Sequence, residues 1–251
     1  MPIEESSAAI VLRARDYSES DRIVTLLTRE FGKLSGIAKG AKASRRRFEN
    51  KLELFSLVTL FFRRRPQGQL VFITRAERSE DAPPRLDDDL GKIALGSYML
   101  ELADALTTEE AEAAAAYQVL CDALGALGQA GATSALRAAY ELKMLEATGF
   151  GLDFSRCRIC EAATGSRNEA VYFISSRGGV VCTRCRAQVP ETAIRLSADS
   201  ATTLTRLQVA SFDRIPAPAH SGGDAALAIA RFLTSILDRR LRSVEFLDSL
   251  L

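Results

Sequence analysis

Apolar and polar residues alternate through most of the first 80 residues, and this two-residue period predicts β-strands. In the first segment Arg13 and Arg15 alternate with apolar neighbours, and short polar or glycine-containing turns separate the segments that follow. One longer connection lies between the third and fourth segments. The predicted strands are residues 9–16, 21–30, 32–40, 54–62 and 69–77. Five strands in so short a stretch predict a small closed barrel.

Beyond Pro83 and Pro84 the apolar residues recur at helical intervals instead. The predicted helices are residues 90–107, 109–127, 133–149, 196–210 and 222–243. In the last of these we place one apolar stripe on Ala226, Ala230, Leu233, Leu237 and Leu241. Residues 150–190 interrupt the helical period and contain a predicted hairpin at 170–182.

These patterns indicate an α+β multidomain chain. An N-terminal five-stranded OB-fold barrel occupies residues 1–80 and precedes an all-helical domain with an inserted four-cysteine zinc module. We place the helical domain at residues 81–155 and 190–251, and the insertion at residues 156–189. The OB-fold is the best-known barrel of this size and often binds oligonucleotides, although other small barrels share the strand count.

The overall charge is nearly balanced, with 33 basic and 32 acidic side chains, but its distribution is uneven. Residues 1–80 have a net charge of +6, residues 81–150 of −8 and residues 151–251 of +3. The hydrophobic content of 47% is typical of a soluble globular protein. No run approaches the ~20 apolar residues of a membrane helix, and acids occupy the first residues, where a signal peptide needs positive charge. We therefore expect a cytoplasmic protein.

Two basic clusters mark the predicted barrel. The first follows the third strand and contains five cations without an acid: Lys39, Lys42, Arg45, Arg46 and Arg47. The second lies in the turn between the last two strands: Arg63, Arg64 and Arg65. A charge run is often only a solvated loop, but two clusters on one barrel favour contact with nucleic acid phosphates. Phe31 or Phe48 could stack on a base, although each is more often a core residue.

Four cysteines form two C-x2-C pairs separated by 21 residues: Cys157, Cys160, Cys182 and Cys185. Each pair can present two thiolates from one tight turn, and two pairs complete a tetrahedral zinc site. Four cysteines leave no position for water or substrate, so we expect one structural Zn²⁺. The alternative is four unligated thiols, one pair of which could be redox-active.

No catalytic motif stands out. The phosphate-binding patterns G-x-x-x-x-G-K-[ST] and G-x-G-x-x-G are absent, as is G-x-S-x-G. His220 is the single histidine, and Asp87 to Asp89 are interpreted as the start of a helix. We therefore expect that the protein is not an enzyme. Two alternatives stay open: a ligase-like nucleic-acid enzyme, against which the absence of K-x-D-G argues, and a zinc-ribbon transcription or interaction factor.

Three segments resemble the bacterial RecO family of DNA repair proteins. Residues 13–48 resemble its barrel signature, with the Y-x-E-x-D turn at residues 17–21, T-x-x-x-G-K at 28–33 and A-K-G-A at 38–41. Residues 145–160 resemble the entry to its zinc site, and residues 231–247 its C-terminal helix and tail.

The resemblance implies a recombination mediator without catalytic turnover. Such proteins bind single- and double-stranded DNA, anneal complementary strands and, with RecR, help load RecA onto DNA covered by single-stranded-DNA-binding protein. The resemblance assigns DNA binding to the basic barrel segment and zinc to the four cysteines. It implies a cytoplasmic, nucleoid-associated protein with no membrane contact.

Overall fold

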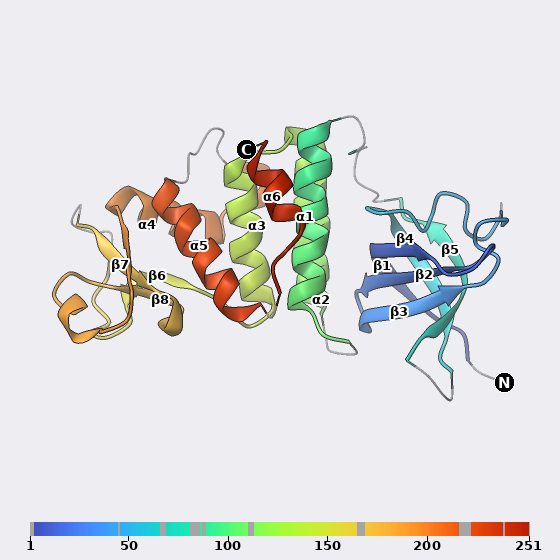
Figure 1. Ribbon diagram of the computed structural model, residues 1–251, viewed down its shortest axis with the longest axis horizontal. Coiled ribbons are helices and arrows are strands. Elements are labelled where there is room, and N and C mark those ends of the chain that lie inside the picture. The colour runs from blue at the N-terminus through green and yellow to red at the C-terminus, as the bar shows by residue number, and fades with distance from the viewer. Residues whose placement is uncertain are drawn as a thin grey trace. The chain divides into compact units, whose positions relative to one another are not determined.

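The computed structural model describes residues 3–44, 46–65, 69–80, 86, 89–109, 113–164, 169–215, 222–237 and 239–250 (Figure 1). Two compact units divide the chain, Met1–Ala130 and Gly131–Leu251. No helix among these residues combines the length and apolar character needed to cross a membrane.

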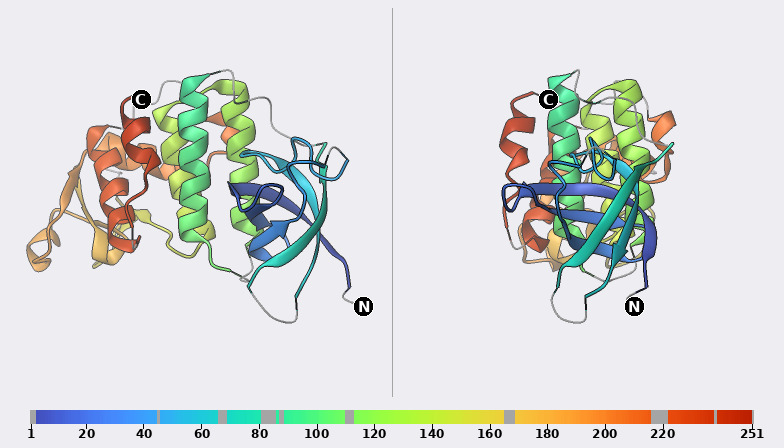
Figure 2. Two further views of the ribbon diagram at one scale, coloured as in Figure 1. Left: turned by 45° about the vertical axis from the view of Figure 1, so that its right-hand side comes forward. Right: turned by 90° about the vertical axis from the view of Figure 1, so that its right-hand side faces the viewer.

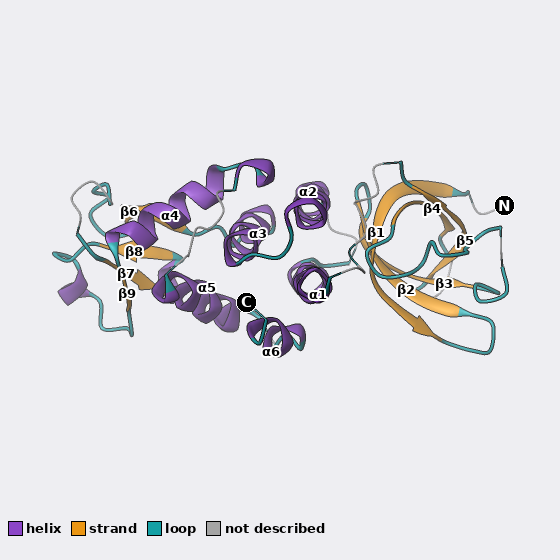
Figure 3. Cartoon of the chain, turned by 90° about the horizontal axis from the view of Figure 1, so that it is seen from above, coloured by secondary structure: helices purple, strands orange, loops and turns teal. Residues whose placement is uncertain are grey.

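The first unit contains a closed five-stranded barrel, which confirms the fold expected for the N-terminal region. Its strand order is β1-β2-β3-β5-β4, and Figure 3 shows its curved strands. Neighbouring strands are antiparallel except β3 and β5, whose short parallel pairing at Gly36–Val71 and Ile37–Phe72 closes the barrel. The strands are β1 (Glu5–Asp16), β2 (Arg22–Thr28), β3 (Gly32–Ala38), β4 (Leu57–Arg63) and β5 (Val71–Arg78).

Alternate apolar side chains of every strand fill the barrel. Leu26, Leu60 and Phe62 are fully buried, as the two-residue period of the strands requires. The connection between β3 and β4 adds Phe48 and Leu52, which are 3% and 1% exposed. This connection is therefore part of the folded barrel.

Helices α1 (Leu90–Leu106) and α2 (Ala114–Ala130) belong to the same unit and contact strands of the barrel. Asp89 caps α1, because its side chain accepts a hydrogen bond from the Lys92 amide. The buried Asp104 carboxylate pairs with Arg13 of β1 at 3.2 Å, and Lys33 of β3 donates to the Asp104 backbone oxygen at 2.7 Å. Two barrel cations thus attach the acidic helix to the barrel.

The second unit packs helices against a small sheet of order β6-β8-β7-β9 (Figure 2). Its strands are β6 (Asp153–Cys157), β7 (Val171–Ile174), β8 (Gly179–Val181) and β9 (Ile194–Leu196), with short 3-10 turns η1 (Ser175–Arg177) and η2 (Arg186–Gln188). Phe154 and Phe173 of the sheet pack with Phe232 of α5. We call residues 153–196 the cysteine module.

The helices of this unit are α3 (Ser134–Ala147), α4 (Ala198–Val209), α5 (Gly223–Ile236) and α6 (Ser243–Asp248), with the 3-10 turn η3 (Phe212–Arg214) after α4. Thr133 caps α3 and Ser197 caps α4 through their side-chain oxygens.

The apolar stripe predicted for the last long helix is wrong at Ala226 and Ala230, whereas Leu233 and Leu241 are buried as predicted. Helix α5 ends at Ile236, and Ala226 and Ala230 are exposed. The buried face is instead Ala225, Ala228, Ile229, Phe232 and Leu233. Because the segment is rich in alanine and leucine, more than one stripe fits its sequence, and the contacts of α5 with β9, α3 and α4 select the face.

Candidate nucleic-acid interface and metal centre

The first basic cluster lies in the segment that follows β3, which we call the basic loop (residues 39–47). Lys39, Lys42, Arg46 and Arg47 are all exposed there. Arg45 lies outside the described residues. None of the four exposed cations pairs with the acidic helix α1, whose Asp104 is held by Arg13 and Lys33 instead.

Two cations of the basic loop are held by neighbouring groups. The Lys42 ammonium lies 2.9 Å from an Asp16 carboxylate oxygen and donates to the Ser18 carbonyl at 3.0 Å. The Arg47 guanidinium donates to the Lys39 carbonyl at 3.1 Å and lies over the Phe48 ring. Lys39 and Arg46, by contrast, form no ion pair and donate no side-chain hydrogen bond within the described part of the chain. The charge of Lys39 nevertheless helps to lower the pKa of Asp21.

The basic loop is attached to the turn between β1 and β2. Asp21 accepts a hydrogen bond from the Gly40 amide at 2.9 Å, and the Lys42 amide donates to the Ser20 carbonyl. The Gly40 amide lowers the pKa of Asp21, and the Lys42 ammonium lowers the pKa of Asp16. Gly40 has a φ of +66°, which a residue with a side chain rarely adopts. The Y-x-E-x-D turn at residues 17–21 and the basic loop at residues 39–47 therefore meet in the structure.

A cavity of about 470 Å³ opens beside the basic loop. Its lining combines Arg22 and Lys42 with Glu49, Glu53 and the edge of Phe48. Arg22 pairs with Asp16 at 3.2 Å and with Glu53 at 2.5 Å. Because its charges are mutually balanced, the cavity is not itself an anion site.

The second basic cluster lies at the end of β4. Arg63 and Arg64 approach Glu4 and Glu5 at 3.8 and 3.2 Å. Arg65 is exposed and lies over the Phe72 ring, 5.8 Å from its centroid. Nearby on β5, Arg75 lies 3.3 Å from the centroid of Phe61. The sequence analysis missed Phe61, Phe72 and Arg75; their signal is aromatic rings at outward positions of barrel strands.

The two phenylalanines considered for base stacking have other roles. Phe48 is 3% exposed and belongs to the barrel core, so it is not available to stack on a base. Phe31 packs edge-on against the core residue Phe62, with Arg64 over its ring.

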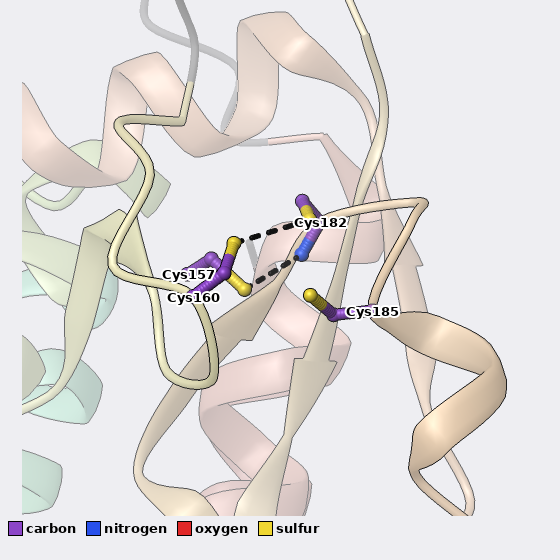
Figure 4. A group of neighbouring side chains, drawn as sticks. All are labelled: Cys157, Cys160, Cys182 and Cys185. Atoms are coloured by element: carbon purple, nitrogen blue, oxygen red, sulfur yellow. Dashed lines mark hydrogen bonds between the residues drawn. The ribbon is translucent and has the colours of Figure 1, made fainter.

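The four cysteines predicted to bind metal come together in the cysteine module (Figure 4). All four sulfur atoms lie within 4.8 Å of one another, and the Cys160 and Cys182 sulfurs are 3.8 Å apart. A tetrahedral zinc site with Zn–S bonds of about 2.3 Å separates its sulfurs by about 3.8 Å, whereas a disulfide needs about 2.05 Å. The thiols are free and fit a single metal ion.

Backbone amides support this cluster. The Cys182 amide donates to the Cys157 sulfur at 3.3 Å. Burial raises the pKa of the Cys157 thiol, but the amides of Cys160, Cys182 and Ile159 outweigh it and lower that pKa to about 6. Burial and the neighbouring thiols raise the pKa of Cys185 to about 12. The arrangement favours thiolate at Cys157, and a bound cation would favour it at all four sulfurs.

Glycines let the strands around the cluster approach closely. Gly178 has a φ of +58°, and a side chain at Gly179 would meet the Asp153 carbonyl oxygen at 2.7 Å. The four sulfurs complete one coordination shell and leave no position for a reacting group, so the arrangement suits a structural metal.

Family models match nearly the whole chain. The model described as "Recombination protein O N terminal" matches residues 1–80, and "Recombination protein O C terminal" matches residues 87–245.

Curated relatives are similar over the same length. The chain is 39% identical to a DNA repair protein RecO of Anaeromyxobacter dehalogenans, over 96% of this chain and 94% of the relative. It is 35% identical to the RecO of Symbiobacterium thermophilum and 33% identical to that of Geobacter sulfurreducens, over 96% of this chain and 95% and 96% of those relatives. The chain therefore belongs to the RecO family of DNA repair proteins.

Proposed function

We propose that this chain is a recombination mediator without catalytic turnover. It binds single- and double-stranded DNA, anneals complementary strands and, with RecR, helps load RecA onto DNA covered by single-stranded-DNA-binding protein. One observation carries the proposal: a RecO family chain has a barrel whose basic loop exposes Lys39 and Arg46, neither of which forms an ion pair among the described residues. As a mediator it acts in the cytoplasm, associated with the nucleoid.

The physical basis is charge neutralisation. Cations that contact phosphates release condensed counterions, and this release supplies affinity for any sequence. Neutralising two strands at once reduces their mutual repulsion, while the base edges stay free to pair. We assign the contact to Lys39, Lys42, Arg45, Arg46, Arg47, Arg63, Arg64 and Arg65. Lys39, Arg46 and Arg65 contribute most, because they form no ion pair and donate no side-chain hydrogen bond among the described residues.

Zinc has a structural role in this proposal. One Zn²⁺ held by Cys157, Cys160, Cys182 and Cys185 would fix the cysteine module, and the thiolates would supply all of its protein ligands. The DNA contact does not pass through the metal.

The test is a binding series with fluorescently labelled single strands at several salt concentrations. Replacing the five cations of residues 39–47 by alanine should make the negative slope of log K against log salt shallower by about 3.5, because each phosphate contact contributes about 0.7. A strand-annealing assay, with and without single-stranded-DNA-binding protein, should show the same variant to be slower. An unchanged slope and annealing rate would refute the role of this loop.

A matched pair of variants compares the two loop cations that have no side-chain partner with the two that do. Lys39→Ala/Arg46→Ala and Lys42→Ala/Arg47→Ala remove the same charge from the same loop. The first variant should make the negative salt slope shallower by about 1.4, and the second should change it by less.

The ligase alternative has its own test. Incubation with nicked DNA and a nucleotide cofactor should give no joining, whereas strand joining would revive that alternative.

A further inference from the structure

A β-bulge in the barrel changes the direction of one arginine. The pairing of β4 with β5 runs Leu60↔Ala76 and Phe61↔Arg75, and then shifts to Phe62↔Ile73. Thr74 is the extra residue, and its hydroxyl donates to the Phe61 carbonyl at 3.1 Å. Because side chains alternate along a strand, Arg75 would face inward beside Ile73 in a regular register. The bulge instead directs it outward, opposite Phe61.

The outer surface of this β4–β5 ribbon therefore combines aromatic rings with cations. Phe61 is paired with Arg75, and Phe72 with Arg63, in the outward register positions. Both rings are half-buried, and the Arg75 side chain is 40% exposed. Arg65 lies over Phe72 and Arg75 over Phe61. We call Phe61, Arg63, Arg65, Phe72 and Arg75 the Phe–Arg platform.

The platform extends from the basic loop to the second basic cluster, with which it shares Arg63 and Arg65. The Ala76 amide, next to Arg75, donates to the Arg47 carbonyl of the basic loop at 3.1 Å. At the other end, Arg63 closes β4 and leads directly to Arg64 and Arg65. Cations thus stand at both ends of a short aromatic ribbon (teal in Figure 2).

The acids of this surface do not cancel its charge. Glu77 pairs with Arg75, and Glu4 lies 3.8 Å from Arg63. Arg65 has no carboxylate partner within the described residues. The Arg75 guanidinium pairs with Glu77 and lies over the Phe61 ring, while its side chain stays 40% exposed.

We infer that the Phe–Arg platform binds unpaired bases of single-stranded DNA by stacking, while the flanking clusters hold the phosphates. The inference rests on the proposed function and specifies the strand that this face prefers. Guanidinium planes and aromatic rings both stack on bases without reading their edges. Duplex DNA keeps its bases inside the helix and can contact only the cations.

The experiment compares three labelled ligands of equal length: oligo-dT, an abasic single strand with the same phosphates, and a duplex. The wild-type chain should bind oligo-dT more tightly than the abasic strand. Phe72→Leu and Arg75→Lys, which keep volume and charge respectively, should weaken oligo-dT binding by about 5- to 150-fold per lost stack. Their affinities for the abasic strand and the duplex should stay unchanged.

Lys39→Ala/Arg46→Ala is the control, because loss of phosphate contacts should weaken all three ligands alike. Thermal unfolding of each variant shows whether the barrel is intact, and Phe72→Leu and Arg75→Lys test the same stacking by different chemistry. Equal binding of oligo-dT and the abasic strand by the wild type, or wild-type oligo-dT affinity in both platform variants, would overturn the inference and leave the proposed function standing. No binding of any ligand would overturn both.

Discussion

The barrel and the cysteine module maintain their structures by different means. The barrel surrounds a continuous cluster of 15 buried apolar residues among those described. The buried cluster around the cysteines has five described members, and two of them are Cys157 and Cys185. So small a core does not stabilise a fold alone, whereas metal binding in small zinc modules contributes about 10–16 kcal/mol. The barrel is held by its own apolar core. In the module, the sheet residues Phe154 and Phe173 pack with Phe232 of α5, but the surroundings of the cysteines have little core and would depend on a bound metal.

The clearest sequence motif and the proposed DNA-binding surface therefore lie in different regions of the chain. The C-x2-C pairs are the strongest pattern in the sequence, yet their four sulfurs form a closed cluster that leaves no coordination position for a reacting group. The barrel has no comparable motif. Its surface derives from exposed cations, from the outward rings of β4 and β5, and from one bulge. A strong motif therefore indicates where a fold needs support, which is not always where it binds a partner.

Loss of one thiol should have the greatest consequence, confined to the module. Cys185→Ser removes a buried ligand, so we expect loss of zinc and opening of the module, which forfeits much of the roughly 10–16 kcal/mol that metal supplies. Zinc content and protease cleavage within residues 153–196 measure this. Cys121→Ser, outside the cluster, is the matched control. DNA binding at low salt should persist; a variant that keeps a protease-resistant module would contradict the comparison.

Truncation of a side chain in the barrel core should destabilise the barrel and leave the cysteine module intact. Phe62 is fully buried, so Phe62→Ala should lower the free energy of unfolding of the barrel by about 3–5 kcal/mol. Denaturant unfolding measures the loss, and the zinc content should stay at the wild-type value. Leu54→Ala, at a side chain 46% exposed, should change stability by less than about 0.5 kcal/mol. Equal losses in the two variants would mean that the barrel does not depend on its core.

Acid should have the smallest of these effects. It should weaken the attachment of the basic loop to the turn between β1 and β2. The pKa values of Asp16 and Asp21 are lowered in the folded state, by Lys42 and by the Gly40 amide respectively. Their contribution is therefore complete above the unfolded-state pKa of about 3.9 and is lost as the pH falls through the folded-state values. Protection of the Gly40 amide from hydrogen exchange should stay constant from pH 7 to about pH 4 and decline below it. Asp21→Asn should remove that decline; a decline that begins near neutral pH would point to another group.

The sequence by itself determined most of the strands and helices and identified the four cysteines that come together. Alternation located five strands because a side chain on a strand either enters the core or leaves it. The C-x2-C spacing identified the four thiols, because only a tight turn brings two cysteines to one ion. Thr133 and Ser197 cap their helices through side-chain oxygens, and such caps depend only on neighbouring residues.

Tertiary structure alone decided which of several equivalent residues perform each role. Lys42 is held by Asp16 while Lys39 stays open, and Arg13 pairs with Asp104 although some 90 residues separate them. The buried face of α5 differs from the predicted stripe, and the bulge at Thr74 directs Arg75 toward Phe61. These outcomes depend on contacts between distant segments, and a local pattern carries no information about which partner a side chain will meet once the chain has folded.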